Sequence, residues 1–414
     1  MLAIALAAGL YMAWNIGAND VANAMGTSVG SGALTLLGAV LLAGIFEFLG
    51  ATLVGTHVSE TIRKGILETS LFQVDSPLWG PKGPRVLMLG MASALLAAGA
   101  WLQIATMFGL PVSTTHSIVG AVLGFGVVAA GWEAVAWGTV AKIVASWVIS
   151  PILGGVLGAA MFLLVRRRIL RQADPIAATR RLGPHLVAAV AFVLVLSLVY
   201  KGLRNVLSHP AWWMTVLVAA VVAGGAYAIT RWRLRCTRAD PDHPFQYVER
   251  VFGRLQIATA CYVAFAHGAN DVANAVGPLA AVIQIADVGM LPEKVPVPFW
   301  VLAVGAGGIV VGLATWGYKV IATIGKKITE LTPTRGFSAE FGAATTVLIA
   351  SRLGLPVSTT HTLVGAVIGV GLARGIGALN VRQVGRIANS WLATIPAAAL
   401  FSSLTFLLLR AFLL

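Results

Sequence analysis

Long apolar stretches constrain this chain more than any other feature of its sequence. A helix that spans a bilayer needs about 20 apolar residues, and the chain offers twelve candidate runs. Charged residues make up only 11% of the sequence, against about 25% in soluble domains, so they cannot cover a soluble protein of this length. The apolar residues come in runs and do not alternate, which excludes a transmembrane β-barrel. The runs are 1–25, 34–56, 86–108, 132–148, 150–165, 184–203, 211–230, 252–276, 297–318, 338–352, 383–396 and 397–413.

These runs predict an all-α polytopic membrane protein with about twelve transmembrane helices. Two loops, 166–181 and 231–250, hold most of the arginine excess. Basic loops stay on the cytoplasmic side, so the net charge of +14 indicates membrane orientation and not a nucleic-acid partner. Counting spans outward from these loops places both termini on the external, periplasmic face of an inner membrane. The basic loop at 63–85 argues against this orientation, because it would then be external.

The chain repeats itself. The octapeptide GANDVANA at residues 17–24 recurs at 268–275, and the octapeptide GLPVSTTH at 109–116 recurs at 354–361. Shorter matches between and after these motifs occur in the same order in both places. Because several markers keep one order, the sequence predicts two copies of a single structural unit.

The first unit covers residues 1–165 and the second covers 251–414, with a connector of two helices and two basic loops at 166–250. By the span count each unit has five spans and the units begin on opposite sides of the membrane, so the repeats are inverted. Two further runs, 110–130 and 355–376, open with polar clusters and carry many glycines, which predicts re-entrant hairpins. Inverted repeats of this kind are typical of secondary transporters, whose site lies near the midplane between the repeats.

The GANDVANA motif places a carboxylate inside an apolar span in both units, at Asp20 and at Asp271. An ionised aspartate at the bilayer centre costs about 2.5–3.5 kcal/mol or more, which favours a function over a mere contact between packed helices. Gly17 and Gly268 precede the aspartates and are expected to let the helix unwind and expose carbonyl groups. Carboxylate, amide and carbonyl oxygens suit a hard monovalent cation, and a carboxylate equally suits a proton. The candidate cation ligands are Asn19, Asp20, Asn23, Asn270, Asp271 and Asn274.

The PVSTTH motif predicts the start of a helix. Proline suits the first turn, and serine or threonine suits the cap. A helix that starts inside the membrane directs free N–H groups and a positive dipole end into the protein. Surrounded by hydroxyl groups, such a helix start favours a tetrahedral oxyanion, with simple capping of a re-entrant helix as the alternative. The candidate anion ligands are Ser113, Thr114, Thr115, Ser358, Thr359 and Thr360.

Four other polar residues are candidates for coupling or gating. His116 and His361 follow the hydroxyl runs and could carry protons, although such a histidine more often anchors a hairpin by hydrogen bonding. Glu47 lies in an apolar run, and its counterpart in the second unit is Ile309. Glu340 begins a span, where a solvated carboxylate in the first helical turn is an equal alternative to a buried functional one.

Together these motifs resemble the inorganic phosphate transporter (PiT) family. The resemblance includes Phe46-Glu47, ETIRKGI at 60–66 and GFSAE at 336–340, and it covers both units. It implies an inverted-repeat fold with two re-entrant hairpins, external termini, a homodimer, and symport of inorganic phosphate with Na⁺ or H⁺ without another cofactor. The connector departs from the longer members, because it holds no large cytoplasmic domain. The resemblance further implies phosphate at the two Ser-Thr-Thr runs and Na⁺ at Asp20, Asn23, Asp271 and Asn274.

The expected function is import of phosphate by alternating access at a midplane site formed by both units. A sulfate permease of the same family and a metal-phosphate/H⁺ symporter remain alternatives. A membrane enzyme such as a phosphatase is disfavoured, because the sequence offers no further nucleophile–base pair. An ion channel rarely needs two carboxylates beside two anion cradles. Phosphate keeps a P–OH donor near neutral pH and sulfate has none, so a buried acceptor beside the anion would favour phosphate.

Overall fold

The computed structural model describes residues 1–54, 66–199, 211–290, 297–352 and 357–414. Within this part of the chain the protein is helical, and its β-structure consists of two isolated bridges. Nine of the described helices are long and apolar enough to cross a membrane, against about twelve spans expected from the sequence. The all-helical, multi-pass membrane architecture is confirmed.

Two long helices account for part of the difference in span number. α6 (Trp137–Val165) and α14 (Val381–Leu413) are each continuous where two spans were expected. Pro151 and Pro396 lie inside these helices, and a proline kinks a helix without reversing the chain. The division of each helix into two spans is therefore wrong. The pairs in question are 132–148 with 150–165, and 383–396 with 397–413.

The first re-entrant hairpin is larger than expected. It consists of α4 (Gly83–Met107) and α5 (Thr114–Ala130). Leu67, before α4, forms an antiparallel bridge with Val135, after α5, so the chain enters and leaves the hairpin at the same place. The apolar run 86–108 is therefore the first arm of the hairpin, and it is also long and apolar enough to cross a membrane.

The second hairpin is built in the same way. It consists of α12 (Pro333–Arg352) and α13 (Thr359–Arg374). Thr329 and Leu379 form the bridge that closes its base. The run 338–352 is thus again a hairpin arm, and both units combine crossing helices with one hairpin.

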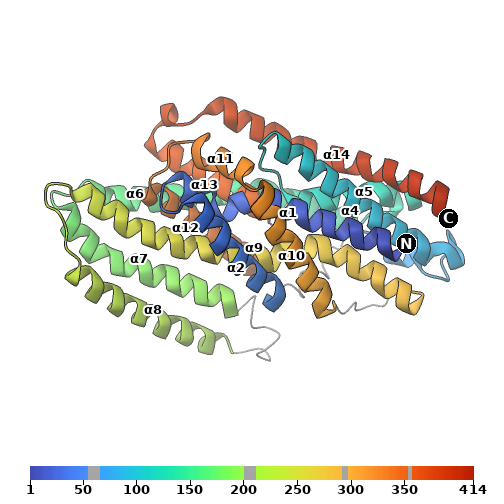
Figure 1. The fold of residues 1–414 in the computed structure, drawn as a ribbon, viewed down its shortest axis with the longest axis horizontal. Helices are drawn as coiled ribbons and strands as arrows, with labels where there is room; N and C mark the ends of the chain where they lie inside the picture. The colour runs from blue at the N-terminus through green and yellow to red at the C-terminus, as the bar shows by residue number, and fades with distance from the viewer. Residues whose placement is uncertain (55–65, 200–210, 291–296, 353–356) are drawn as a thin grey trace.

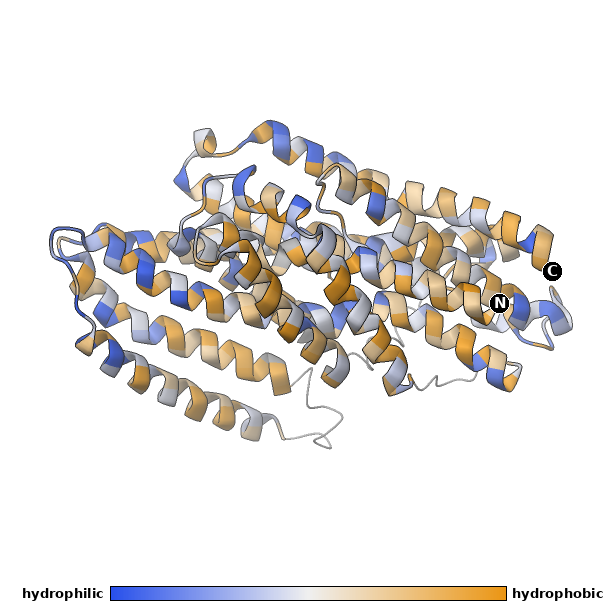
Figure 2. Ribbon diagram, in the orientation of Figure 1, coloured by the Kyte–Doolittle hydropathy of each residue, from blue (hydrophilic) through white to orange (hydrophobic). Residues whose placement is uncertain are grey.

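The other helices cross the molecule or connect the two units. Figure 1 shows both termini together at one end of the molecule, opposite the loops that join α6 to α7 and α8 to α9. In Figure 2 hydrophilic residues gather at these loops and hydrophobic residues follow the helices. The bounds are α1 (Leu2–Gly30), α2 (Leu36–Val54), α7 (Pro175–Ser197), α8 (Trp212–Cys236), α9 (Pro244–Val288), α10 (Phe299–Trp316) and α11 (Tyr318–Lys326).

The helices α1 and α9 run through the GANDVANA motifs without interruption, so the unwinding expected at Gly17 and Gly268 is wrong. These glycines instead allow close packing of helices. A Cβ atom on Gly17 would lie 1.8 Å from the carbonyl oxygen of Ile309, and one on Gly268 would lie 2.2 Å from that of Glu47. Small residues let helix backbones approach closely in this way, and they bring α10 against α1 and α2 against α9.

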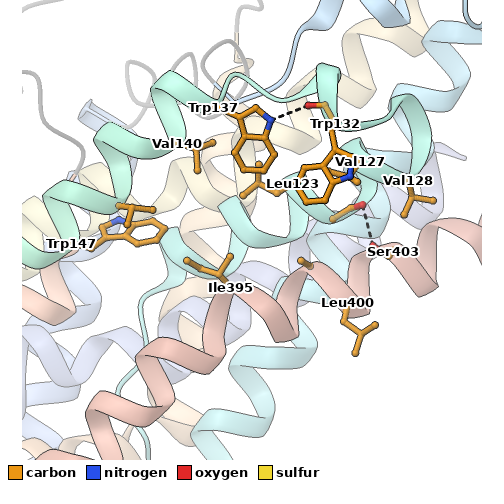
Figure 3. Close-up of a pocket in the computed structure, with 13 residues that line it drawn as sticks. Leu123, Val127, Val128, Trp132, Trp137, Val140, Trp147, Ile395, Leu400 and Ser403 are labelled. Atoms are coloured by element: carbon orange, nitrogen blue, oxygen red, sulfur yellow. Dashed lines mark hydrogen bonds between the residues drawn. The ribbon is translucent and has the colours of Figure 1, made fainter.

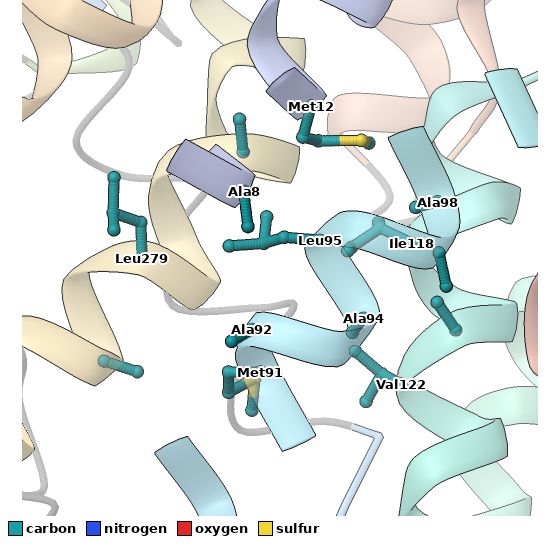
Figure 4. Close-up of a cluster of buried hydrophobic side chains, with 14 of the residues drawn as sticks. Ala8, Met12, Met91, Ala92, Ala94, Leu95, Ala98, Ile118, Val122 and Leu279 are labelled. Atoms are coloured by element: carbon teal, nitrogen blue, oxygen red, sulfur yellow. The ribbon is translucent and has the colours of Figure 1, made fainter. Parts of the chain in front are cut away.

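Apolar side chains hold the first hairpin against α1 and α9. Figure 4 shows Leu95 of α4 in one cluster with Ala8 of α1 and Leu279 of α9, and all three are buried. Burial of a leucine side chain contributes about 1.5–3 kcal/mol. The first hairpin is therefore seated on a dry, close-packed surface.

The second arm of each hairpin packs on the long helix of the other unit. A Cβ atom on Gly124 of α5 would lie 2.1 Å from the carbonyl oxygen of Ala399 in α14. A Cβ atom on Gly369 of α13 would lie 2.1 Å from the carbonyl oxygen of Gly155 in α6. The two units are thus interlocked by a pair of equivalent glycine contacts.

Candidate functional site

The hydroxyl runs lie at the starts of the returning hairpin arms. Ser113 caps α5 and accepts a hydrogen bond from the backbone N–H of His116 at 3.2 Å. Ser358 caps α13 and accepts from the N–H of His361, also at 3.2 Å. The predicted helix starts are confirmed, although Pro111 precedes the cap and is not in the first turn. A capping hydroxyl that accepts one bond still has its own hydrogen to donate, and the first N–H groups of each helix have no partner within the helix.

The motifs of the two units meet in one buried site. Thr360 of the second hairpin donates a hydrogen bond to Asp20 Oδ1 in the first unit, with a distance of 2.7 Å. In the opposite direction, Asn274 Nδ2 of the second unit donates to Thr114 Oγ1 at 3.1 Å and to Thr115 Oγ1 at 3.3 Å. Each hydroxyl run therefore contacts the GANDVANA motif of the other unit.

Donors within the second unit surround Asp271. Asn274 Nδ2 lies 3.1 Å from Asp271 Oδ1, and Asn270 Nδ2 lies 3.3 Å from the same oxygen. Thr359 Oγ1 donates to Asp271 Oδ2 at 3.4 Å. Asp20 and Asp271 are each 1% exposed, so charge on either carboxylate must be balanced inside the protein.

The sequence interpretation missed His267, which joins the two aspartates. Its Nε2 atom lies 3.0 Å from Asp271 Oδ2 and 3.5 Å from Asp20 Oδ2, and its Nδ1 atom lies 3.1 Å from Glu47 Oε1. One ligand atom from each of Asp20, His267 and Asp271 lies within 4.8 Å of the other two, as a metal site would require. A signal was present, since the equivalent position in the first unit, 251 residues earlier, is Ile16.

Glu47 therefore belongs to this site, as its position in an apolar run suggested. It is 1% exposed on α2, and its only described ion-pair partner is His267. The close approach of Gly268 to the backbone of Glu47 brings α2 to α9 at this point. Gly17 approaches the backbone of Ile309 in the same way. Ile309 is the counterpart of Glu47 and Ile16 that of His267, so two apolar residues stand where the second pair of helices has a carboxylate and an imidazole.

Asn19 holds the tip of the first hairpin. Its Nδ2 atom donates to Thr106 Oγ1 at 2.9 Å and to the carbonyl oxygen of Leu110 at 3.1 Å, and its Oδ1 atom accepts from the N–H of Val112 at 3.1 Å. Both ends of the amide are thus engaged with the chain between α4 and α5. The side chain of Asn23 lies outside the described part of the structure.

The two histidines lie directly behind the hydroxyl runs and contact each other. The ring centroids of His116 and His361 are 4.3 Å apart. Trp147 packs on His116 at 3.5 Å, and Trp391 stacks on His361 at 3.8 Å. Trp391 also donates to the carbonyl oxygen of Pro111 at 3.0 Å. These rings connect the two hairpins by packing, and the proposed anchoring or proton-carrying roles of His116 and His361 stay predictions.

An apolar pocket of about 390 Å³ lies beside this site, between α5, α6 and α14 (Figure 3). Trp147 lies at one end of it, and Trp132 and Trp137 lie at the other. The hydroxyl of Ser403 donates to the carbonyl oxygen of Gly124. Because the lining offers almost no polar group, this pocket does not suit an inorganic ion.

A model of the phosphate transporter family matches residues 16–402. The chain belongs to the phosphate transporter family. A protein of Pyrococcus abyssi with "phosphate permease" in its name is 51% identical, over 99% of this chain and 98% of the relative. The chloroplastic inorganic phosphate transporter 2-1 of Arabidopsis thaliana is 47% identical, over 94% of this chain and 69% of the relative. A solved structure titled "The sodium-dependent phosphate transporter" is 43% identical, with a TM-score of 0.89, and the match covers 100% of this chain and 99% of the other.

Family membership confirms the resemblance stated from the paired motifs. This member of the phosphate transporter family is a multi-pass integral membrane transporter and not an enzyme. The site described above therefore lies in a transport protein, and its buried charges are to be understood as parts of a carrier.

A second buried carboxylate of this phosphate transporter family member lies apart from the aspartates. Glu340 is 0% exposed. Its helix begins at Pro333, so Glu340 lies about two turns inside the helix and the alternative of a solvated first-turn carboxylate is wrong. Four side chains donate hydrogen bonds to its oxygens, and they come from α1 and α9. The donors are Thr27, Ser28, Gln256 and Thr259.

Proposed function

We propose that this protein imports inorganic phosphate by symport with Na⁺, with alternating access to one site formed by both units. The observation that carries the proposal is the convergence of both hydroxyl runs and both aspartates in a single buried cluster. Thr360 with Asp20, and Asn274 with Thr114, connect opposite units at this point. Movement of one unit against the other would open this cluster to either side.

The hydroxyl runs are the proposed phosphate ligands. Two helix starts direct unpaired N–H groups and the positive ends of two dipoles toward the cluster. The hydroxyl hydrogens of Ser113 and Ser358 remain available after capping, and Thr114 and Thr115, which accept from Asn274, can donate theirs as well. A tetrahedral oxyanion with several acceptor oxygens satisfies such a set of donors from two sides.

The aspartates are the proposed cation sites. The ligands are oxygens of Asp20 and Asp271 with the amide oxygen of Asn274, and Asn23 would complete the first copy. Cations there neutralise the carboxylates and attract the anion to the adjacent helix starts. His267 lies between the two aspartates and its other nitrogen faces Glu47, so these residues can also carry a proton. The 43% identical sodium-dependent structure supports Na⁺ over H⁺.

The orientation and assembly are also proposals. The basic loops at 166–181 and 231–250 favour a cytoplasmic position for that end of the molecule, and both termini lie at the opposite end (Figure 1). We propose an inner-membrane protein with periplasmic termini, which functions as a homodimer. An impermeant thiol reagent applied outside intact cells should therefore label a cysteine placed at Leu414 and spare Cys236.

Counterflow of labelled phosphate in proteoliposomes tests the function, with Na⁺ and pH gradients set independently. We expect Na⁺-driven uptake that arsenate inhibits and equal sulfate does not, because arsenate carries the same acidic proton as phosphate and can donate it to a buried acceptor. Asp20→Asn and Asp271→Asn should each abolish cation-coupled uptake in a protein that still inserts. Competition by sulfate at concentrations similar to phosphate, or unchanged ion dependence in both variants, contradicts the proposal.

A metal-phosphate/H⁺ symporter is the second candidate. The compact arrangement of Asp20, His267 and Asp271 favours it, because one imidazole and two carboxylates also suit a divalent metal. Phosphate uptake that requires a divalent cation and ignores the Na⁺ gradient would support this candidate over Na⁺ symport.

A further inference from the structure

A second cavity, which carries charged side chains, lies at the tip of the first hairpin. It has a volume of about 600 Å³ and lies between that tip, the end of α11 and the first turns of α14. Phe108 and Leu110 are its hairpin residues. The complete lining is Trp101, Phe108, Leu110, Lys327, Gln383, Arg386, Asn389, Ser390 and Ala393.

The charges of this cavity are all positive. Lys327 and Arg386 line it, and no described carboxylate does. Neither cation has an ion-pair partner among the described residues. Nearby basic groups differ in this respect, since Arg335 and Arg374 both pair with Glu330 at 3.1 Å. The cavity therefore keeps two uncompensated cations beside amide and hydroxyl groups, a lining that suits a hydrated anion.

The cavity leads toward the proposed phosphate ligands. Leu110, in its wall, accepts a hydrogen bond from Asn19, the residue before Asp20, and Ser113 follows three residues later. Trp391 comes directly after Ser390 of the lining, and it contacts both Pro111 and His361. The hairpin tip and this tryptophan therefore connect the wall of the cavity with the two hydroxyl runs.

The other side of the cavity lies at the first turns of α14, which hold Gln383 and Arg386. α14 has 33 residues and so is about 50 Å long. Its last residues lie beside the N-terminus (Figure 1), so the helix runs from the termini past Trp391 to Gln383 and Arg386, which lie farther from the termini. The cavity thus lies on the side of the hairpin tip that faces away from the termini, which is the proposed cytoplasmic side.

We propose that this cavity is an anion vestibule on the cytoplasmic side, where inorganic phosphate pauses between water and the hydroxyl runs, and that Lys327 and Arg386 recruit it. The inference rests on the proposed function. It adds a cavity in which phosphate binds transiently and two residues, Lys327 and Arg386, that attract it. A cleft lined by charge of one sign raises the local concentration of its counter-ion and the rate of association, in a salt-dependent way.

A sided transport assay tests the vestibule. In inside-out vesicles, Arg386→Gln and Lys327→Gln should each raise the apparent KM for cytoplasmic phosphate about three- to tenfold and weaken its dependence on ionic strength. The KM for external phosphate should stay unchanged in right-side-out vesicles. Arg382→Gln is the matched control, because this exposed arginine lies one turn earlier on α14 and does not line the cavity. Equal shifts on both faces, or shifts no larger than in the control, would overturn the inference.

Chemical modification of a cysteine tests the positive charge of the vestibule without a transport measurement. Asn389→Cys is introduced into a chain with Cys236→Ser and Cys261→Ser, the only two native cysteines. Two methanethiosulfonate reagents of opposite charge are then compared. The ratio of the reaction rate of the negative reagent to that of the positive one should be about tenfold higher at the introduced cysteine than for free cysteine. Arg386→Gln should reduce this preference, and inorganic phosphate should slow the modification. A charge preference equal to that of free cysteine refutes the vestibule. A preference that is present at the introduced cysteine while the wild-type chain transports no phosphate refutes the proposed function instead.

Discussion

The two hairpins dock on the same pair of helices with opposite chemistry. In the first hairpin Leu95 packs on α1 and α9 through apolar side chains (Figure 4). In the second hairpin the equivalent residue is Glu340, given the shift of 245 residues between the hairpins, and it docks through hydrogen bonds. With the shift of 251 residues between α1 and α9, the neighbours correspond as well. Ala5, Ala8 and Leu279 of the apolar surface correspond to Gln256, Thr259 and Ser28 of the polar one.

This difference teaches which hairpin can respond to ions. An apolar contact depends little on ionic conditions, so docking of the first hairpin should not depend on the coupling ion. The contact around Glu340 depends on a buried charge that needs a proton, a cation or strong donors to be stable. Docking of the second hairpin is thereby open to control by the coupling ion.

The largest expected effect comes from copying the carboxylate into the apolar surface. Leu95→Glu buries a charge beside Ala8 and Leu279 with no donors around it, at a cost of several kcal/mol. We expect a severe loss of folded protein in detergent. Leu95→Met, which conserves volume, should cost less than about 1.5 kcal/mol. Adding Ala5→Gln and Ala8→Thr to Leu95→Glu should recover part of the yield, and a failure of any recovery would argue against the equivalence of the two surfaces.

Removal of the charge from the polar surface should be less harmful to folding but severe for transport. Glu340→Gln keeps one acceptor oxygen, where Thr27 donates to Oε1, and places an NH₂ group where Thr259 donates to Oε2. The Thr259 hydroxyl can accept from that group, and the negative charge is removed. We expect Na⁺-driven phosphate uptake to fall at least about tenfold, with the melting temperature nearly unchanged. Ser338→Ala, two residues earlier on α12, is the control, since that hydroxyl bonds only within its helix. Uptake that stays at the wild-type level would show that Glu340 has a structural role alone.

A smaller loss of phosphate uptake is expected at the second place where the units differ. There the second unit's His267 pairs with Glu47, and the equivalent residues, Ile16 and Ile309, are apolar. Glu47→Gln and His267→Gln should each reduce uptake, and the double variant should be little worse than the worse single one. Residues in one ion-pair network typically couple by about 0.5–3 kcal/mol. Strictly additive losses in this double-mutant cycle would mean that the two residues act independently.

The smallest effect concerns the base of the second hairpin, where Arg335 and Arg374 hold the pKa of the exposed Glu330 below its ordinary value. A lowered folded-state pKa adds stability above the unfolded pKa, and this stability disappears as the pH falls through the folded value. Glu330→Gln should therefore lower the melting temperature slightly at neutral pH and not at all in strong acid. The first hairpin has no such arginine pair, because Ala129 stands where Arg374 does. A difference that persists in strong acid would point to packing.

The sequence predicted the class of fold and the main site residues, because the repeats mark both. Asp20 and Asp271 are conspicuous as charges in apolar runs, and the serine caps follow from local helix chemistry. Span number was less predictable. Periodicity cannot show whether an apolar run crosses the membrane or turns back, and a proline such as Pro151 can end a helix or lie within one.

The polar partners of the carboxylates were not predictable from the motifs. Gln256 and Thr259 lie outside both repeated octapeptides, and only the packing of α9 on α12 directs them to Glu340. His267 is adjacent to a motif, but its counterpart in the first unit is Ile16. Residues that the two units share therefore do not indicate it. The two units differ at positions such as His267 and Ile16, where one unit has an ionisable residue and the other an apolar one.

The interlocking glycine contacts have a consequence for how this protein is made. The contact of α5 with α14 joins residues 279 positions apart, as in the hydrogen bond from Ser403 to Gly124. At a synthesis rate of about 5–20 residues per second, α5 is in the membrane for tens of seconds before its partner exists. The glycine surface of the first hairpin therefore stays without this partner until α14 has been made.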